Sequence, residues 1–137
     1  MENWVDEVIA KWEGENLKIN DGASSGLIAM AESFLNFQFP TDFKDLYSKM
    51  NGFDYLEWQE HLFSFWSIER IIEEFESDKD FIGFSDYSLS ANHIGFRKGI
   101  DGIHKIYPSL DDIQPELIAK NFKEVVDMIN MNAKLVY

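Results

Sequence analysis

The chain has 137 residues, a length at which one domain buries roughly two-thirds of the surface that its unfolded chain exposes. Hydrophobic residues make up 45% and aromatic residues 15%, which excludes a disordered chain and predicts one folded domain over 1–137 with a dense aromatic core. The 25 acidic and 12 basic residues give a net charge of −13, which disfavours direct binding to nucleic acid or anionic membranes and favours encounters with basic proteins. The alternative is that the excess of acid serves only solubility.

Export, membrane insertion and cysteine chemistry are not indicated. The uncharged apolar stretches are far shorter than the roughly 20 residues of a membrane-spanning helix, and residues 1–12 are acidic and amphipathic, unlike a signal peptide. The absence of cysteine excludes disulfides, thiolate metal ligands and a cysteine nucleophile. We therefore expect a cytoplasmic protein that is stabilised by packing alone.

Two helices are predicted in the first quarter of the chain. Asn3 is placed to cap a helix that ends at Trp12, with apolar residues at helical spacing: Trp4, Val5, Val8, Ile9 and Trp12. Residues 13–25 are polar and rich in turn formers, which predicts a loop. Ser24 or Ser25 can cap a second helix, whose apolar positions are Leu27, Ile28, Met30, Ala31, Phe34 and Leu35.

A third helix has punctuation residues at both ends. Pro40 suits its first turn, because proline lacks only an amide hydrogen that would be unpaired there. One face carries Phe43, Leu46, Tyr47 and Met50. Asn51 and Gly52 predict the end of the helix, since glycine readily adopts the left-handed conformation that stops one.

The pattern then changes to short aromatic runs. FDYLEW and HLFSFW in residues 53–66 predict two strands that a hairpin could join. Ser67 predicts the cap of a fourth helix, which reaches Phe75 with isoleucines inward and glutamates outward. Further strands are expected near 81–84, 91–96 and 103–107, with a turn at 98–102. Pro115 is expected to open a last helix that ends near Asn130.

The stretch AESFLNFQFPTDFKDLYSKMNG resembles the SUKH superfamily, named for the yeast cell-wall-assembly regulator domain. The family pattern is a leucine-proline pair, an acidic-aromatic-lysine step and a closing Asn-Gly. Here it is met by Phe39-Pro40, Asp42-Phe43-Lys44 and Asn51-Gly52. Weaker matches at 65–69, 81–86 and 118–125 extend the resemblance over about 27–130, although Asn121 stands where the family often has serine.

The resemblance implies a single α+β domain with a central twisted sheet, mixed or antiparallel, flanked by about five helices. It also implies an immunity protein, which neutralises a cognate bacterial toxin, commonly a nuclease, by stoichiometric binding. A non-catalytic regulatory or scaffolding module, as in the family's eukaryotic members, is the alternative. The family has no shared catalytic residues, so the resemblance predicts neither an enzyme nor a cofactor.

The residues themselves also lack an evident catalytic or metal site. The near-neutral acid–base candidates are His61, His93 and His104. His93 and His104 could face each other across a hairpin, but the chain has no helical i, i+4 histidine pair. We interpret them as solvated strand histidines and predict no metal site.

Two acidic patches are the candidate surfaces for a basic toxin. Carboxylates placed where a nuclease expects phosphates would add association rate and specificity. One patch lies on the fourth helix at Glu69, Glu73 and Glu76, with Asp78 and Asp80 after the helix. The other combines Asp54, Glu57 and Glu60 with the aromatic anchors Tyr55 and Trp58. The alternative is that the charges only solvate a helix face and that Trp58 belongs to the core.

Overall fold

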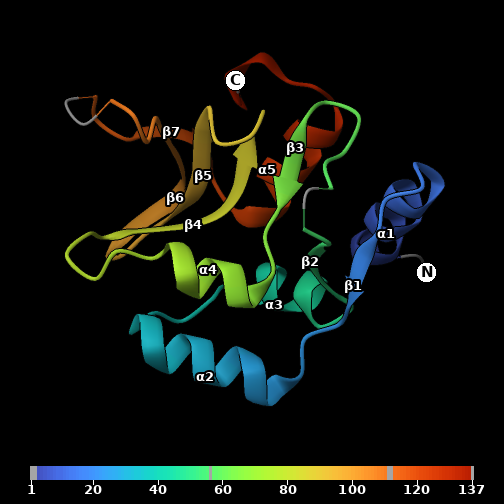
Figure 1. The fold of residues 1–137 in the computed structure, drawn as a ribbon, viewed down its shortest axis with the longest axis horizontal. Coiled ribbons are helices and arrows are strands. Elements are labelled where there is room, and N and C mark those ends of the chain that lie inside the picture. Colours follow the sequence, from blue (N-terminus) through green and yellow to red (C-terminus); the bar gives the residue numbers. More distant parts are fainter. Residues whose placement is uncertain (1–2, 56, 111–112, 137) are drawn as a thin grey trace.

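A five-stranded antiparallel sheet and a two-stranded sheet organise the chain (Figure 1). In the computed structural model, which describes residues 3–55, 57–110 and 113–136, the larger sheet has the order β3-β4-β5-β6-β7. Its strands are β3 (Phe63–Phe65), β4 (Phe81–Tyr87), β5 (Asn92–Arg97), β6 (Ile100–Ile106) and β7 (Glu116–Ala119). The smaller sheet pairs β1 (Ile19–Asp21) with β2 (Met50–Phe53).

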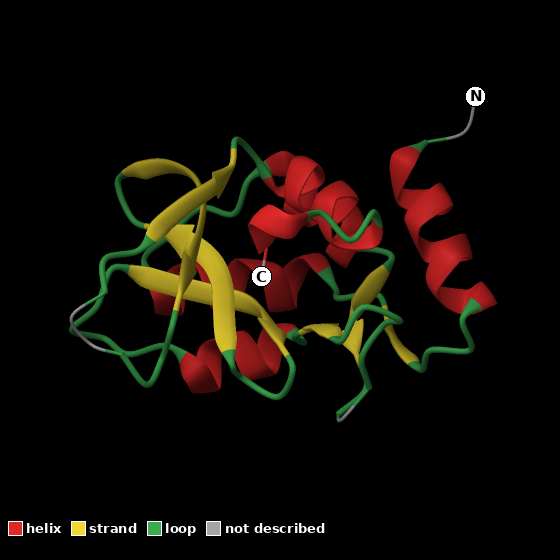
Figure 2. Cartoon of the chain, turned by 90° about the horizontal axis from the view of Figure 1, so that it is seen from above, coloured by secondary structure: helices red, strands yellow, loops and turns green. Residues whose placement is uncertain are grey.

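Five α-helices accompany these sheets in the described part of the chain, which confirms the predicted α+β class. They are α1 (Trp4–Gly14), α2 (Ser25–Leu35), α3 (Thr41–Tyr47), α4 (Ile68–Glu74) and α5 (Phe122–Asn130), followed by a 3₁₀ turn at Lys134–Val136. The five-stranded sheet occupies one end of the molecule, and α1 with the small sheet occupies the other (Figure 2).

The core is an aromatic cluster between the larger sheet and helices α3 and α5. Phe43 of α3 stacks on Tyr47 with ring centroids 4.1 Å apart, and it meets Phe122 of α5 at 5.1 Å. Phe122 in turn lies 5.0 Å from Phe84 of β4. Trp12 attaches α1 to this core, since its ring contacts Phe53 and Phe65 and its indole N–H donates to Asn130. Packing of this density, with offset and edge-to-face rings, stabilises the domain without disulfides.

The predicted helix starts are confirmed at three positions. Asn3 accepts from the amide of Val5, Ser24 from that of Leu27 and Ser67 from that of Arg70. Each cap satisfies an amide that has no partner within its own helix. The same chemistry at α5 was not predicted: Asn121 accepts from the amide of Glu124.

Three predictions of secondary structure are wrong, because the pairing of strands that are distant in sequence could not be predicted from local pattern. Residues 13–25 contain β1, which has only three residues and little hydrophobic signal. The strand expected at FDYLEW is wrong except at Phe53, because β2 spans Met50–Phe53. The hairpin left open between β2 and β3 is not formed either, since β2 pairs with β1 and β3 with β4. Pro115 precedes β7 and not a helix, since the apolar pair Leu117 and Ile118 fits either period.

The Asn51-Gly52 pair has a different role from the predicted helix stop. Helix α3 ends at Tyr47, and both residues lie in β2. Asn51 accepts from the amide of Ile68 at 2.7 Å and donates to the carboxylate of Glu69 at 2.8 Å, so it binds the first turn of α4. Gly52 has a φ of 72°, and a Cβ there would collide with the backbone of Trp66. The pair therefore holds β2 against the junction of β3 and α4, Asn51 by hydrogen bonds and Gly52 by close backbone packing.

Asn51→Ala should lower the free energy of unfolding by about 1–3 kcal/mol, because it leaves the buried Ile68 amide without an acceptor. Urea denaturation followed by circular dichroism measures the change. Gln38→Ala is the control, since Gln38 is exposed, and it should alter stability by less than about 0.5 kcal/mol. Equal stability of the two variants would contradict the role of Asn51.

Candidate functional site

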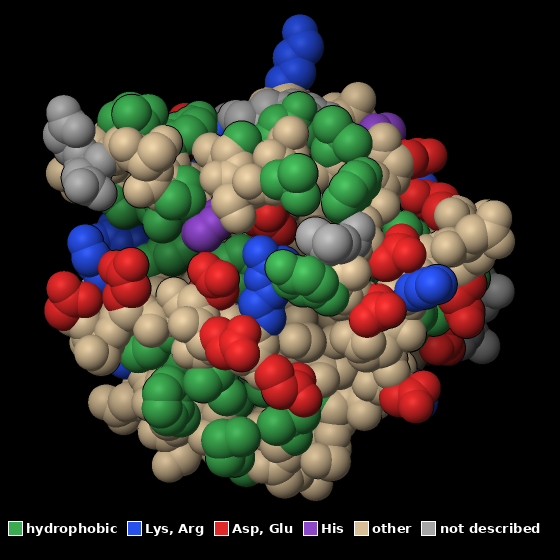
Figure 3. All heavy atoms as spheres, in the orientation of Figure 1, with side chains coloured by type: hydrophobic (Ala, Val, Ile, Leu, Met, Phe, Trp, Pro, Cys, Tyr) green, Lys and Arg blue, Asp and Glu red, His purple; other side chains and the backbone are tan. Residues whose placement is uncertain are grey.

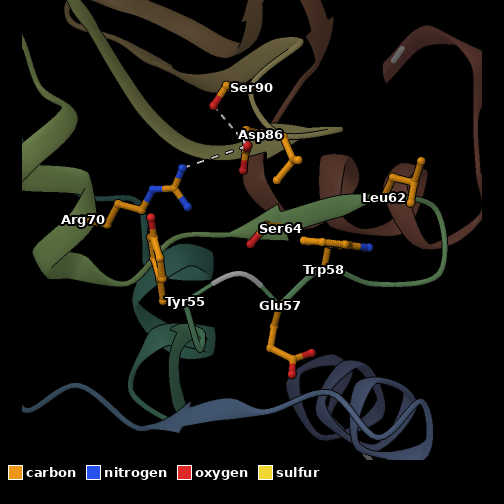
Figure 4. A pocket seen from close by; sticks show the side chains of 9 residues that line it. Tyr55, Glu57, Trp58, Leu62, Ser64, Arg70, Asp86 and Ser90 are labelled. Atoms are coloured by element: carbon orange, nitrogen blue, oxygen red, sulfur yellow. Dashed lines mark hydrogen bonds and ion pairs between the residues drawn. The ribbon is translucent and has the colours of Figure 1, made fainter.

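A cavity of about 210 Å³ opens between α4, the connection from β2 to β3, and the turn from β4 to β5 (Figure 4). Arg70 points from α4 toward Asp86 of β4, while Tyr55 and Trp58 come from the β2–β3 connection. A second cavity of about 420 Å³ shares Tyr55 and Arg70 with the first. The two cavities are therefore adjacent on the surface.

The rim of the smaller cavity carries four large hydrophobic side chains exposed to solvent. Tyr55 is 77% exposed, Trp58 42%, Leu62 44% and Leu89 71%. We call these four residues the apolar patch. Because Trp58 is partly exposed and lines the cavity, it is not the core residue that the alternative interpretation required. Clusters of exposed aromatic and aliphatic side chains beside a cavity are typical of protein-binding surfaces.

Both leucines of the apolar patch have left-handed backbone conformations. Leu62 has a φ of 70° and Leu89 a φ of 56°, with Ser88 and Ser90 beside Leu89 at 47° and 73°. Such a conformation costs a residue other than glycine roughly 1–2 kcal/mol. The two turns hold each other, since the amide of Ser88 donates to the carbonyl of Leu62 at 2.9 Å. The fold thus maintains strained backbone at both leucines of the apolar patch.

Asp86 forms the polar floor of the cavity. This buried carboxylate accepts from the Trp66 indole N–H at 2.8 Å and from the Ser90 hydroxyl at 3.2 Å, and the Arg70 guanidinium lies 4.0 Å away. Arg70 also lies 4.6 Å from the centre of the Trp66 ring, in a cation–π arrangement. The Trp66 and Ser90 donors hold the Asp86 carboxylate, and this carboxylate together with the Trp66 ring orients Arg70.

The histidines are not the solvated pair that was predicted. His93 stands opposite Ile106 and His104 opposite Gly95, so the two imidazoles do not face each other. His104 is buried, and His93 packs edge-on against Trp66 at 5.0 Å. Burial lowers the pKa of both below the ordinary value. Within 3–55, 57–110 and 113–136, no group of three or more histidine, aspartate or glutamate side chains is arranged to hold a metal ion.

The structure brings the two predicted acidic patches together only in part, since Glu60, Asp78 and Asp80 line neither cavity. Asp54, Glu69 and Glu73 line the larger cavity, and Glu57 lines the smaller one. We call these four residues the acidic rim. Glu76 is exposed beyond the end of α4 and lines neither cavity.

Sequence reasoning missed four residues of this site: Leu62, Arg70, Asp86 and Leu89. Asp86 and Arg70 are brought together by the packing of α4 on β4, which no local pattern reports. The leucines gave one weak signal, because Leu89 is a hydrophobic residue in the polar turn Ser88-Leu89-Ser90.

The fold and this surface define a small α+β domain whose exposed hydrophobic side chains gather beside four carboxylates. The chain belongs to the SMI1 / KNR4 family (SUKH-1), which it matches over residues 22–128, more than half of its length. This match confirms the resemblance seen in the block that ends at Gly52. No curated protein matches the chain. In the described ranges, every helix is too short or too polar to cross a lipid bilayer.

The neighbours of His93 predict opposite effects of two substitutions on its pKa. Burial is the largest cause of the lowered pKa, the charge of Asp86 raises it and the charge of Arg70 lowers it. Arg70→Gln should therefore raise the pKa of His93, and Asp86→Asn should lower it further. NMR titration of the imidazole protons measures both changes. Arg97→Gln is the control, because Arg97 acts on the pKa of His104.

The same lowered pKa gives stability a pH dependence of known sign. As the pH falls below 6.5, the ordinary pKa, the unfolded chain binds a proton at His93 before the folded chain does. The free energy of unfolding should therefore decrease with acidification in this range, and His93→Gln should reduce the slope. An unchanged slope in chemical denaturation series would show that His93 is not protected from protonation.

Proposed function

We propose that this protein is an immunity protein, which neutralises a cognate bacterial toxin by stoichiometric binding through the apolar patch and the acidic rim. The observation that carries the proposal is the pair of exposed leucines, Leu62 and Leu89, held in left-handed conformations beside one cavity. Exposed hydrophobic surface and backbone strain both cost folding free energy, and a partner that covers the surface supplies a reason for both. Membership of the SMI1 / KNR4 family (SUKH-1) is consistent with this role.

Charge supports a basic partner, and a nuclease is the expected toxin. The acidic rim adjoins the apolar patch, with Glu57 in the same cavity and the other three carboxylates in the neighbouring one, and the whole chain carries a net charge of −13. Complementary charge accelerates association, while desolvated aromatic, arginine and aliphatic anchors supply most of the binding free energy. In this proposal Tyr55, Trp58, Leu89 and Arg70 are anchors, and the acidic rim steers the toxin toward them.

The proposal is tested first by identifying the partner. The protein is used as bait in a lysate of its native organism, and retained proteins are identified by mass spectrometry. We expect one tightly bound toxin domain, whose purified activity falls to zero at a one-to-one ratio with this protein. Retention of several weakly bound proteins without toxic activity would instead favour the regulatory or scaffolding alternative.

Leu89→Asn should affect the stability of the fold and the affinity for the toxin in different ways. Asparagine tolerates the left-handed conformation, so the free energy of unfolding should stay the same or rise by about 1 kcal/mol. Toxin affinity should fall at least about tenfold, the loss expected of an anchor side chain. Calorimetry measures both quantities. Leu110→Asn, at an exposed leucine outside the patch, should leave the affinity unchanged.

Charge reversal should affect the rate of association more than the rate of dissociation. Glu57→Lys and Glu73→Lys alter the acidic rim, and Glu76→Lys places the same charge just beyond α4 and outside both cavities. Glu69 is avoided because its carboxylate accepts from Asn51. The two rim variants should associate several-fold more slowly and with a weaker salt dependence. Stopped-flow kinetics measure the association rates. If Glu76→Lys slowed association more than the two rim variants, the interface would not lie at the acidic rim.

A further inference from the structure

Helix α2 has an exposed face without charged residues, although the protein as a whole is strongly acidic. Met30 is 51% exposed and Phe34 59%, one helical turn apart. The remaining outward residues are Ser25, Gly26, Ala29 and Ser33, none of them charged. Figure 3 shows hydrophobic side chains gathered over α2 at the lower edge of the molecule, with acidic side chains above them.

The only charged residue of α2 turns inward. The carboxylate of Glu32 accepts from the amide of Phe39 at 2.8 Å and pairs with the Lys44 ammonium at 3.2 Å, and its side chain is only 11% exposed. A surface helix ordinarily places its charges toward water and its apolar residues toward the core. Helix α2 has apolar residues on both faces, as expected of a helix that is covered on both sides.

Neither backbone conformation nor lack of space in the described part of the chain requires glycine at position 26. Its backbone is not left-handed, and a Cβ at this position would meet only the Ser24 hydroxyl at 3.9 Å. Glycine weakens a helix relative to alanine, so its presence in the first turn of α2 calls for a reason. Open space at an exposed glycine is where a side chain from another molecule can approach the helix backbone.

We propose that α2 is the contact between two copies of this chain, paired antiparallel about a two-fold axis at Met30. Gly26 and Phe34 are each four residues from Met30, so this symmetry places Phe34 of one copy over Gly26 of the other. The largest exposed side chain of the helix then meets the residue without a side chain. The Met30 side chains meet each other on the axis, where their flexibility allows close packing.

Charge identifies the second copy as the occupant of this face. Two molecules that each carry a net charge of −13 repel one another, and α2 is a surface on which they can touch without bringing carboxylates together. A basic partner gains nothing from a face without carboxylates and is attracted to the acidic rim instead. The pairing therefore does not rest on the proposed toxin binding.

The two kinds of association should respond to salt in opposite directions. Salt screens the repulsion between copies, so self-association through α2 should strengthen as salt is added. Binding of a basic toxin should weaken under the same conditions. Because one short helix supplies the contact, the dimer should form in the micromolar range or above. Sedimentation equilibrium should show the mass rising from 16.0 kDa toward twice that value with concentration and with salt.

Single cysteines test the geometry directly, since the natural chain has none. Met30→Cys places the two thiols on the axis, and it should form a disulfide-linked dimer under mild oxidation. Ser25→Cys is the matched control on the same exposed face. Its two thiols would be separated by about 15 Å along the helices, beyond the Cα separation of about 7 Å that a disulfide tolerates.

Two further variants test the fit of Phe34 on Gly26. Phe34→Ser and Gly26→Leu alter exposed positions, so both should retain the circular dichroism spectrum of the folded monomer, and both should weaken self-association at least tenfold. Leu89→Asn should leave it unchanged. The proposal is overturned if the protein stays monomeric at submillimolar concentration in high salt. It also fails if Met30→Cys cross-links no better than Ser25→Cys, or if a dimer forms that Phe34→Ser does not weaken.

Discussion

The position of Trp66 is the constraint on which both the core and the site depend. Its carbonyl accepts from the buried Tyr47 hydroxyl at 2.6 Å, which attaches it to α3. Its indole N–H binds Asp86, one face of its ring carries Arg70, and its edge contacts His93. A Cβ on Gly83 would come within 2.9 Å of the ring. Trp66 thus connects the aromatic core to Asp86 and Arg70 at the floor of the cavity and fixes their positions.

The two exposed apolar surfaces differ in what surrounds them, and this difference separates their partners. The apolar patch adjoins the acidic rim, which suits a basic protein. The face of α2 has no outward charge, which suits a molecule that carries the same net charge. Under the two proposals, a strongly acidic chain binds a basic partner and a copy of itself through distinct surfaces, because charge selects the partner and apolar contact stabilises the complex.

Local chemistry accounts for the parts of the fold that were predicted. Helix caps at Asn3, Ser24 and Ser67 depend on hydrogen bonds to amides within three residues, so sequence alone reveals them. The strands β1 and β7 are short and are defined by partners far along the chain, so they were missed. The Asn-Gly pair correctly predicted a left-handed residue, which is Gly52. Whether such a residue ends a helix or packs against the backbone of Trp66 depends on contacts between distant segments.

The sequence by itself determined the aromatic core and the acidic character of the surface, because these follow from residue types, and its resemblance to the SUKH superfamily indicated the family and the α+β class. Only the tertiary structure decided that Glu69 and Glu73 share a cavity with Asp54, and that Glu76 does not. It likewise decided that Arg70 and Asp86 meet on Trp66 and that Leu62 and Leu89 face solvent in strained turns. The physical reason is that a binding surface is formed by segments distant in sequence, whose proximity is set by core packing.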